Sequence, residues 1–115
     1  MSTITVSIGR NIGDEPMDDH QWVTYQEEAH RWTDQSVWCV GGQIVFEGVG
    51  VGQWTDEDGH TVREDAFTIV ALVDDDVADV VHAEIVRRMA ITARNYGQDA
   101  IAVTLGTTTL AGLDD

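Results

Sequence analysis

Apolar and polar residues alternate near the N-terminus of this 115-residue chain, and the alternation predicts a β-strand over residues 3–8. Ile4, Val6 and Ile8 fall on one face of that strand, because successive side chains of a strand point to opposite faces. A loop rich in glycine, asparagine and aspartate is predicted over 9–16. The chain is therefore expected to begin with a half-buried strand.

The apolar spacing then changes to that of a helix, which we predict over 18–32. Asp18 at the N-cap, with Gln21 three residues later, forms a variant of the capping box. Met17 and Trp22 have the spacing of a hydrophobic staple. An aromatic stripe on such a helix is far more typical of a core than of a platform for a ligand. The expected buried stripe consists of Trp22, Tyr25, Ala29 and Trp32.

Two long strands are predicted in the middle of the chain, over 44–54 and 62–73. Residues 33–36 are expected to break the preceding helix. The short apolar stretch 37–40 is either a small strand of its own or the beginning of the next long one. The stretch 67–73 is apolar on both faces, so the strand that contains it is predicted to be central in the sheet.

The sequence Asp58-Gly59 gives the strongest signal for a hairpin, because a type I′ turn needs positive φ at both central residues. This turn would place Trp54 opposite Arg63, with the indole and the guanidinium stacked. A G-x-G-x-G run can also cradle phosphate, but that requires a strand-to-helix turn, and this run enters a strand. We therefore predict that the glycines serve packing. In this register Gly48, Gly50 and Gly52 share one face with Phe67, Ile69 and Ala71.

A second helix is predicted over 76–96, followed by a last strand over 101–105. Asp74, Asp75 and Asp76 precede this helix, and we expect them to cap its first turn and to interact with its dipole. An aspartate cluster at a strand end can also bind a metal or accept a phosphoryl group, but the sequence supplies no further ligands beside it. The expected buried face consists of Val77, Val81, Ile85, Met89 and Tyr96.

The order strand, helix, strand, strand, helix, strand predicts an α+β fold of the ferredoxin-like βαββαβ type, with two helices on one face of an antiparallel four-stranded sheet. Residues 1–106 are expected to form a single domain, and 107–115 an acidic, partly disordered tail. The other face of the sheet would be uncovered and apolar, which is typical of an interface. We predict a homodimer joined back to back through Val45, Val49, Val51, Val70 and Leu72.

Charge is the unusual feature of the composition. Aspartate and glutamate number 21 against six basic residues, none of them lysine, and the net charge is −15. Such a charge repels nucleic acid and anionic membranes and favours cationic partners. A GC-rich genome or adaptation to high salt explains the bias more readily than a surface that imitates DNA. The N-terminus has no apolar signal region, so a cytoplasmic protein is expected, without membrane contact.

Several residues of the predicted hairpin form a motif together. Gly52-Gln53-Trp54, Asp56, Gly59 and Val62-Arg63-Glu64 fit the pattern G-x-W-x-[DN]-x-x-G-x-x-x-x-E. The chain thereby resembles an uncharacterised family of small bacterial domains with the same βαββαβ order and a D-x-x-W helix start. It departs from that family by extra residues around 32–42. The resemblance implies the fold and no activity.

Catalytic and metal-binding patterns are weak in this sequence. The four histidines, His20, His30, His60 and His82, include no H-x-x-x-H spacing, and the single Cys39 excludes an intrachain disulfide and any multi-cysteine metal site. The acidic turn lacks the glycine and glutamate positions of an EF-hand loop. No nucleophile has a visible base. We therefore expect no metal and no cofactor, and an enzyme is the less favoured class.

Two functions remain open. The first is a small non-enzymatic interaction or regulatory protein, for example in a phage–host setting within the host cytoplasm, that binds a basic protein through an acidic face. The alternative is a dimeric α/β-barrel-type enzyme or small-molecule-binding protein with a pocket between sheet and helices, near Gly48 and Gly50. A pocket lined by Trp22, Trp54, Phe67 and a polar group would favour it. The residues expected to bind the cationic partner are Asp56, Glu57, Asp58, Asp74, Asp75 and Asp76.

Overall fold

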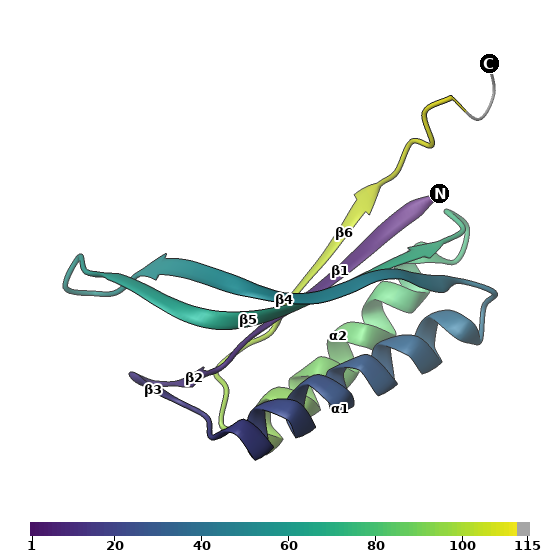
Figure 1. Cartoon of the computed structure of the whole chain (residues 1–115). Helices are drawn as coiled ribbons and strands as arrows, with labels where there is room; N and C mark the ends of the chain where they lie inside the picture. The colour runs from purple at the N-terminus through teal and green to yellow at the C-terminus, as the bar shows by residue number, and fades with distance from the viewer. Residues whose placement is uncertain (113–115) are drawn as a thin grey trace.

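An antiparallel four-stranded sheet carries both long helices on one of its faces in the computed structural model, which describes residues 1–112 (Figure 1). The strands of the sheet follow the order β4-β5-β1-β6, so the order strand, helix, strand, strand, helix, strand and the ferredoxin-like α+β class are confirmed. Residues 113–115 of the predicted tail lie outside the described residues. The elements are β1 (Ser2–Gly9), β2 (Asn11–Ile12), β3 (Glu15–Pro16), α1 (Asp19–Trp38), β4 (Gln43–Thr55), β5 (Thr61–Val73), α2 (Ala78–Asn95) and β6 (Ala102–Thr107).

β5 is central, as its two apolar faces predicted, because it pairs with both β4 and β1. The loop predicted over 9–16 contains the small hairpin of β2 and β3. Within residues 1–112, no helix has the length and apolar character needed to cross a membrane.

The first helix is longer than predicted. Its capping box is present, since the Gln21 amide donates to Asp18 Oδ1 at 2.8 Å and the Asp18 amide donates to Gln21 Oε1. The expected break at 33–36 is wrong, because Ser36 Oγ donates to the Trp32 carbonyl at 2.8 Å and its polar group fits inside the helix. The apolar stretch 37–40 is therefore neither a strand nor the beginning of one. It completes the helix and its C-terminal turn.

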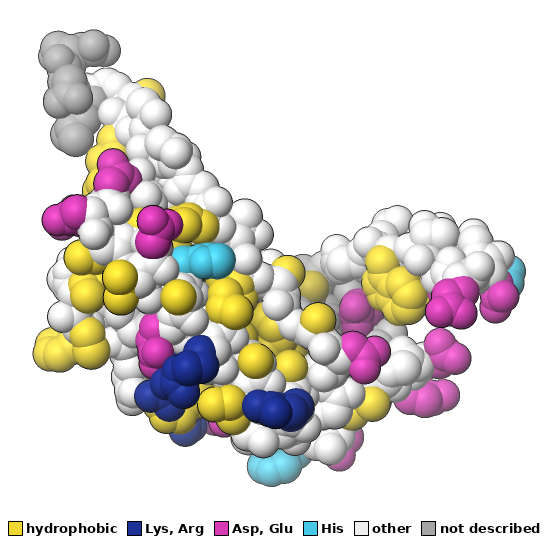
Figure 2. Space-filling view, turned by 180° about the vertical axis from the view of Figure 1, so that it is seen from behind, with side chains coloured by type: hydrophobic (Ala, Val, Ile, Leu, Met, Phe, Trp, Pro, Cys, Tyr) yellow, Lys and Arg dark blue, Asp and Glu magenta, His cyan; other side chains and the backbone are white. Residues whose placement is uncertain are grey.

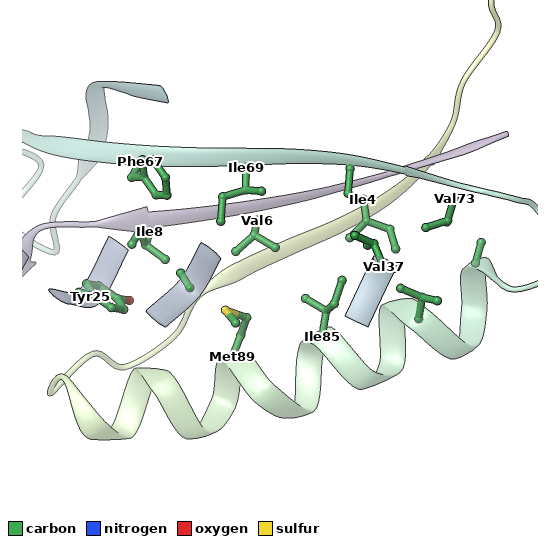
Figure 3. Packing of buried hydrophobic residues seen from close by; sticks show 14 of the residues in the cluster. Ile4, Val6, Ile8, Tyr25, Val37, Phe67, Ile69, Val73, Ile85 and Met89 are labelled. Atoms are coloured by element: carbon green, nitrogen blue, oxygen red, sulfur yellow. The ribbon is translucent and has the colours of Figure 1, made fainter. Parts of the chain in front are cut away.

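The core lies between the sheet and the two helices (Figure 3). Alternate residues of β1 and β5 point into it, and the stripes predicted for both helices supply the facing side chains. The largest fully buried side chains belong to Ile4, Val6, Tyr25, Val37, Ile69, Val73, Ile85 and Met89, with Thr33 and Thr92.

The hairpin between β4 and β5 has a different register from the predicted one. Trp54 pairs with Val62, and Arg63 pairs with Gln53, so Trp54 and Arg63 lie on opposite faces and the predicted stacking is wrong. The physical reason lies in the turn. Asp56 pairs with His60 through its backbone, which leaves a loop one residue longer than a type I′ turn.

The carboxylate of Asp56 stabilises this longer loop. Its Oδ1 accepts hydrogen bonds from the amides of Asp58, at 3.0 Å, and His60, at 2.8 Å. Gly59 alone takes a positive φ, of 82°, as expected for a three-residue loop that ends in a left-handed residue. The hydrogen bonds that the Asp56 carboxylate accepts from its own turn therefore favour the three-residue loop over a two-residue turn.

A shift of one residue moves every side chain of β4 to the other face. Gly48, Gly50 and Gly52 lie on the uncovered face, opposite Thr68, Ala66 and Glu64, and not beside Phe67, Ile69 and Ala71 as predicted. The change also divides the predicted dimer interface. Val49 pairs with Phe67 and Val51 with Asp65 on the helix side of the sheet, whereas Val70 and Leu72 point to the uncovered face.

The far half of the hairpin extends beyond the sheet (Figure 1). β1 ends at Gly9, opposite Ala66, and the Arg10 amide donates once more to the Asp65 carbonyl at 2.9 Å. From there to the turn, β4 and β5 have only each other as strand neighbours. We call residues 51–64 the arm and the rest of the sheet with its helices the body.

Candidate interaction site

The end of the arm carries the acidic residues predicted to bind a partner. Glu57 and Asp58 are exposed, and Asp56 is half-buried because its carboxylate holds the turn. Asp56, Asp58 and His60 each offer one atom within 4.8 Å of the others, so this turn has donors that a metal ion could use. Hydrogen bonds already engage one Asp56 oxygen, however, and Asp58 and His60 are exposed.

The second predicted cluster is far from the first. Asp74, Asp75 and Asp76 follow the other end of β5, so its 13 residues put about 40 Å between the two clusters. The six aspartates and glutamates therefore do not form a single acidic face, as the prediction had assumed. We assign the acidic site to the arm alone.

The aspartates before α2 do not cap it, which corrects the prediction. The N-cap is Val77, and no side chain accepts a hydrogen bond there. Asp75 instead accepts the hydroxyl of Ser2 at 2.8 Å and pairs with the N-terminal amine of Met1 at 3.3 Å. These hydrogen bonds lower the pKa of Asp75 below its usual value. Its function is to fasten the start of β1 to the loop before α2.

β4 forms one edge of the sheet, and most of its residues are exposed. One side of its backbone faces no other strand, and such an edge can pair with an added strand. Large apolar side chains on this strand are more than two-fifths exposed, which is unusual for so many neighbours in one element. They are Val45, Phe46, Val49, Val51 and Trp54.

Arg10 fixes the arm to the body. Its side chain donates to the Met17 carbonyl at 2.7 Å, to Asp65 at 3.2 Å and to Asp19 at 2.8 Å. It thereby joins the base of the arm to the beginning of α1. Apolar periodicity carries no signal for this residue, because its contacts are polar and one of them, Asp65, is distant along the chain.

Glu64 makes a second link at the same place. Its Oε2 accepts the Asn11 amide at 2.7 Å, and its carboxylate lies over Gly9, where a β-carbon would be only 2.4 Å away. A side chain at residue 9 would therefore require the Glu64 carboxylate to shift from this position. The base of the arm is held from both sides, while its end is free.

The three aromatic residues predicted to line a pocket beside Gly48 and Gly50 are separated in the structure. Trp22 and Phe67 are buried in the core, whereas Trp54 lies on the uncovered face of the arm, so the three do not meet. A groove of about 600 Å³ does lie between α1 and β4. His30 Nδ1 and Glu47 Oε2 approach to 2.5 Å within it, and both side chains are exposed. Periodicity could not find this pair, since it joins two elements by tertiary contact.

A second groove, of about 520 Å³, lies between α2 and the segment that leads into β6. Its walls are mainly apolar, and Arg94 and Asp99 are its charged residues. Figure 2 shows arginine side chains among hydrophobic ones on this side of the body, and acidic side chains on the projecting arm. The apolar walls come from Val86, Met89, Ala90, Ala93, Ala100, Ile101 and Val103.

The other arginines of α2 are already occupied. Glu84 accepts hydrogen bonds from Arg87 at 2.8 Å and from Arg88 at 3.0 Å, which lower its pKa to about 2. Arg88 also lies over the ring of Trp32, 4.2 Å from the centroid. Arg94 differs from them, because it has no ion-pair partner among residues 1–112.

Comparison with known proteins relates the chain to others by structure. No family model matches it, and neither does any curated protein sequence. A phage SAM lyase in complex with S-methyl-5′-thioadenosine is similar with a TM-score of 0.62 and 14% identity, over 90% of this chain and 78% of the lyase. At these identities the similarity shows the fold alone.

Two other solved structures have the same fold. A Bacillus cereus protein related to NIF3 gives a TM-score of 0.57 at 12% identity, over 95% of this chain and 26% of that protein. A DUF3240 family protein from Shewanella baltica gives 0.53 at 7% identity, over 96% and 93%. The resemblance to the uncharacterised bacterial family stays a prediction.

Proposed function

We propose that this protein is a non-enzymatic interaction protein that binds a cationic partner through its arm. The observation that carries the proposal is the arm itself, a two-stranded extension with an acidic end and exposed apolar side chains. An isolated two-stranded hairpin is only marginally stable in water. When a protein extends such a hairpin beyond its sheet, the hairpin provides a surface that can insert into a partner protein.

The chemistry of the arm fits a basic partner. Asp56, Glu57, Asp58 and Glu64 stand against a single cation, Arg63, within residues 51–64. Complementary charge speeds association and selects the partner more than it adds affinity.

Apolar side chains can supply the affinity. Val51 is 57% exposed and Trp54 43% exposed, and tryptophan is a common anchor at interfaces. The free backbone of β4 can add main-chain hydrogen bonds to the same contact.

The body gives less support to an enzyme. Its interior between sheet and helices is filled by the core cluster, and the three aromatic residues expected to line a pocket are separated. One of the structurally similar proteins comes from a phage, which is the observation that favours a phage–host setting, in the host cytoplasm, for this proposal.

Binding of synthetic peptides tests the proposal. The probe is an arginine-rich peptide, compared with a glutamate-rich peptide of equal length, and binding is measured by calorimetry at about 150 mM salt. The arm variant replaces Asp56 by Asn, Glu57 by Gln and Asp58 by Asn. Asparagine keeps the Oδ1 acceptor that holds the turn.

A matched control carries Asp74→Asn, Asp76→Asn and Asp79→Asn, which remove the same charge from the region of α2 and spare Asp75. We expect the arm variant to bind the basic peptide about tenfold more weakly, since exposed ion pairs contribute up to about 1 kcal/mol each. The control should change binding about twofold or less. Equal weakening in both variants would show that net charge alone attracts the peptide, and it would refute the role of the arm.

The groove between α1 and β4 supports a second candidate, the binding of a nucleoside-like small molecule. It joins an apolar surface at Phe67 to the polar pair of His30 and Glu47. One similar structure holds S-methyl-5′-thioadenosine. A titration with that compound, followed by NMR, should shift His30 and Glu47 if the candidate is right. The absence of any shift at millimolar ligand would reject it.

A further inference from the structure

Arg94 is one of the exposed arginines that have no ion-pair partner among residues 1–112. Arg94 lies at the last turn of α2 and borders the apolar groove between α2 and β6. It is exposed and has no ion-pair partner among the described residues, although the chain carries 21 acidic side chains for six basic ones. The groove thus offers apolar walls, with the unpaired Arg94 and the carboxylate of Asp99 as its charged residues.

The arm has the complementary character. It presents Val51 and Trp54 together with the carboxylates of Glu57 and Asp58. Trp54 of the same chain faces Gly97–Ala100 across a separate cleft of about 290 Å³, and no arm residue lines the α2–β6 groove. The groove of one chain is therefore left open by its own arm.

We propose that the arm of one copy binds the α2–β6 groove of a second copy, with Arg94 facing the acidic end of the arm. This inference rests on the proposed function, because it uses the same arm and places its acidic end against the single cation of the groove, Arg94, in another copy. The two surfaces that meet are different, so the contact is heterologous. If two chains exchange arms with each other, the contact forms a closed dimer. If each chain gives its arm to a further copy, the contact forms a ring or an open chain of copies.

Overall charge opposes this association and local charge favours it. Two copies that each carry −15 repel one another at low salt. At about 150 mM salt the screening length is about 8 Å, so distant repulsion fades while apolar contact remains. Self-association should consequently strengthen as salt rises from low to physiological values, whereas binding of a basic peptide should weaken.

Sedimentation of matched variants tests the contact. The arm variant described above should lose self-association at least about tenfold, and so should Arg94→Glu. Arg94→Gln tests the same charge without placing an acid at the end of a helix. Arg31→Glu is the control, since Arg31 is another exposed arginine without an ion-pair partner in residues 1–112 but lies on α1. It should leave association within about twofold of the native chain.

Mixing the variants gives the sharpest result. The arm variant keeps its groove and Arg94→Glu keeps its arm, so the two should form a 1:1 complex although neither associates alone. A native chain that stays monomeric at about 500 µM and 150 mM salt would overturn the inference. If basic-peptide binding persisted in that experiment, the proposed function would stand. Association that ignores both variants but fails in Val70→Asp would also overturn it, and would point to the back-to-back sheet dimer.

Discussion

β5 passes through both regions of the molecule, and its residues behave differently in each. From Phe67 to Val73 every second side chain is buried, whereas from Thr61 to Asp65 none is. The sequence and the surroundings change together at this point. On the helix side, β5 has Thr61, Arg63 and Asp65 in the arm and at its base, and Phe67, Ile69, Ala71 and Val73 in the body. β1 and the helices lie beside the second set and end before the first.

This comparison separates the part of the chain that specifies the fold from the part whose side chains are available for binding. The body contains every fully buried side chain of the described residues, and β4 contributes none of them. Changes in the body should therefore act on folding, and changes in the arm on binding. Variants in the body and in the arm test that division, and the largest effect is expected in the body.

Truncation of a buried side chain on β5 should separate the two regions most clearly. Ile69→Ala should lower the free energy of unfolding by about 2–5 kcal/mol, because Ile69 is fully buried. Val51→Ala in the arm should change it by about 0.5 kcal/mol or less. Urea unfolding followed by circular dichroism measures both. If Val51→Ala cost as much as Ile69→Ala, the arm would be part of the cooperative core.

Gly42 provides the next test, just before β4 in the body. A β-carbon there would lie 2.7 Å from the Leu72 carbonyl oxygen and 3.1 Å from that of Val37. Backbone atoms at such distances cannot move aside cheaply. Gly42→Ala should therefore destabilise the protein by about 1–3 kcal/mol, as overpacking does. An unchanged midpoint of urea unfolding would show that β4 can shift at this end.

Tyr25 tests the junction of the two regions at high pH. Burial raises the pKa of its hydroxyl above the usual 10, and the charge of Glu64, at the base of the arm, adds to the effect. The unfolded chain then loses this proton first, so stability is complete below pH 10 and falls above it by up to about 1.4 kcal/mol per pH unit. Tyr25→Phe should remove that part of the fall and keep the ring that stacks on Tyr96.

Unfolding midpoints at pH 9 and pH 11 measure this effect. Tyr96→Phe serves as the comparison, since the pKa of Tyr96 is also raised but its side chain is less buried. Identical slopes for the native chain and Tyr25→Phe above pH 10 would contradict the assignment.

The structure could be predicted from the sequence where a local signal, such as a helix cap, coincided with a clear period of apolar residues. The capping box at Asp18, the stripe of α1 and the alternation of β1 all have their causes within a few residues, and all are confirmed. The order of elements followed from them, and so did the fold. The central place of β5 followed from its two apolar faces.

The features that the sequence did not predict depend on competition between local interactions, or on contacts between segments that are far apart in the chain. The prediction of the hairpin register was wrong because the Asp56 carboxylate accepts hydrogen bonds from the amides of its own turn and thereby stabilises a three-residue loop. α1 continued past the expected break because tertiary burial of Val37 outweighs the weak propensities before it. Arg10 and the pair of His30 and Glu47 join segments far apart in sequence. Periodicity carries no information about such contacts, so the candidate site could be predicted only at the arm's acidic turn.

The smallest expected effect concerns Gly50, which lies in β4 at the base of the arm. No atom lies within 4 Å of the position that a β-carbon would take there, and Gly50 has no positive φ. Alanine therefore fits without strain and narrows the unfolded ensemble, so Gly50→Ala should stabilise the protein by about 0.4–1 kcal/mol. The opposite signs expected for Gly50, within β4, and Gly42, just before it, arise from open space at one position and backbone contact at the other. Urea unfolding of both variants measures the signs directly. A loss of stability in Gly50→Ala would mean that the arm needs glycine to bend there, and that the two regions move relative to each other.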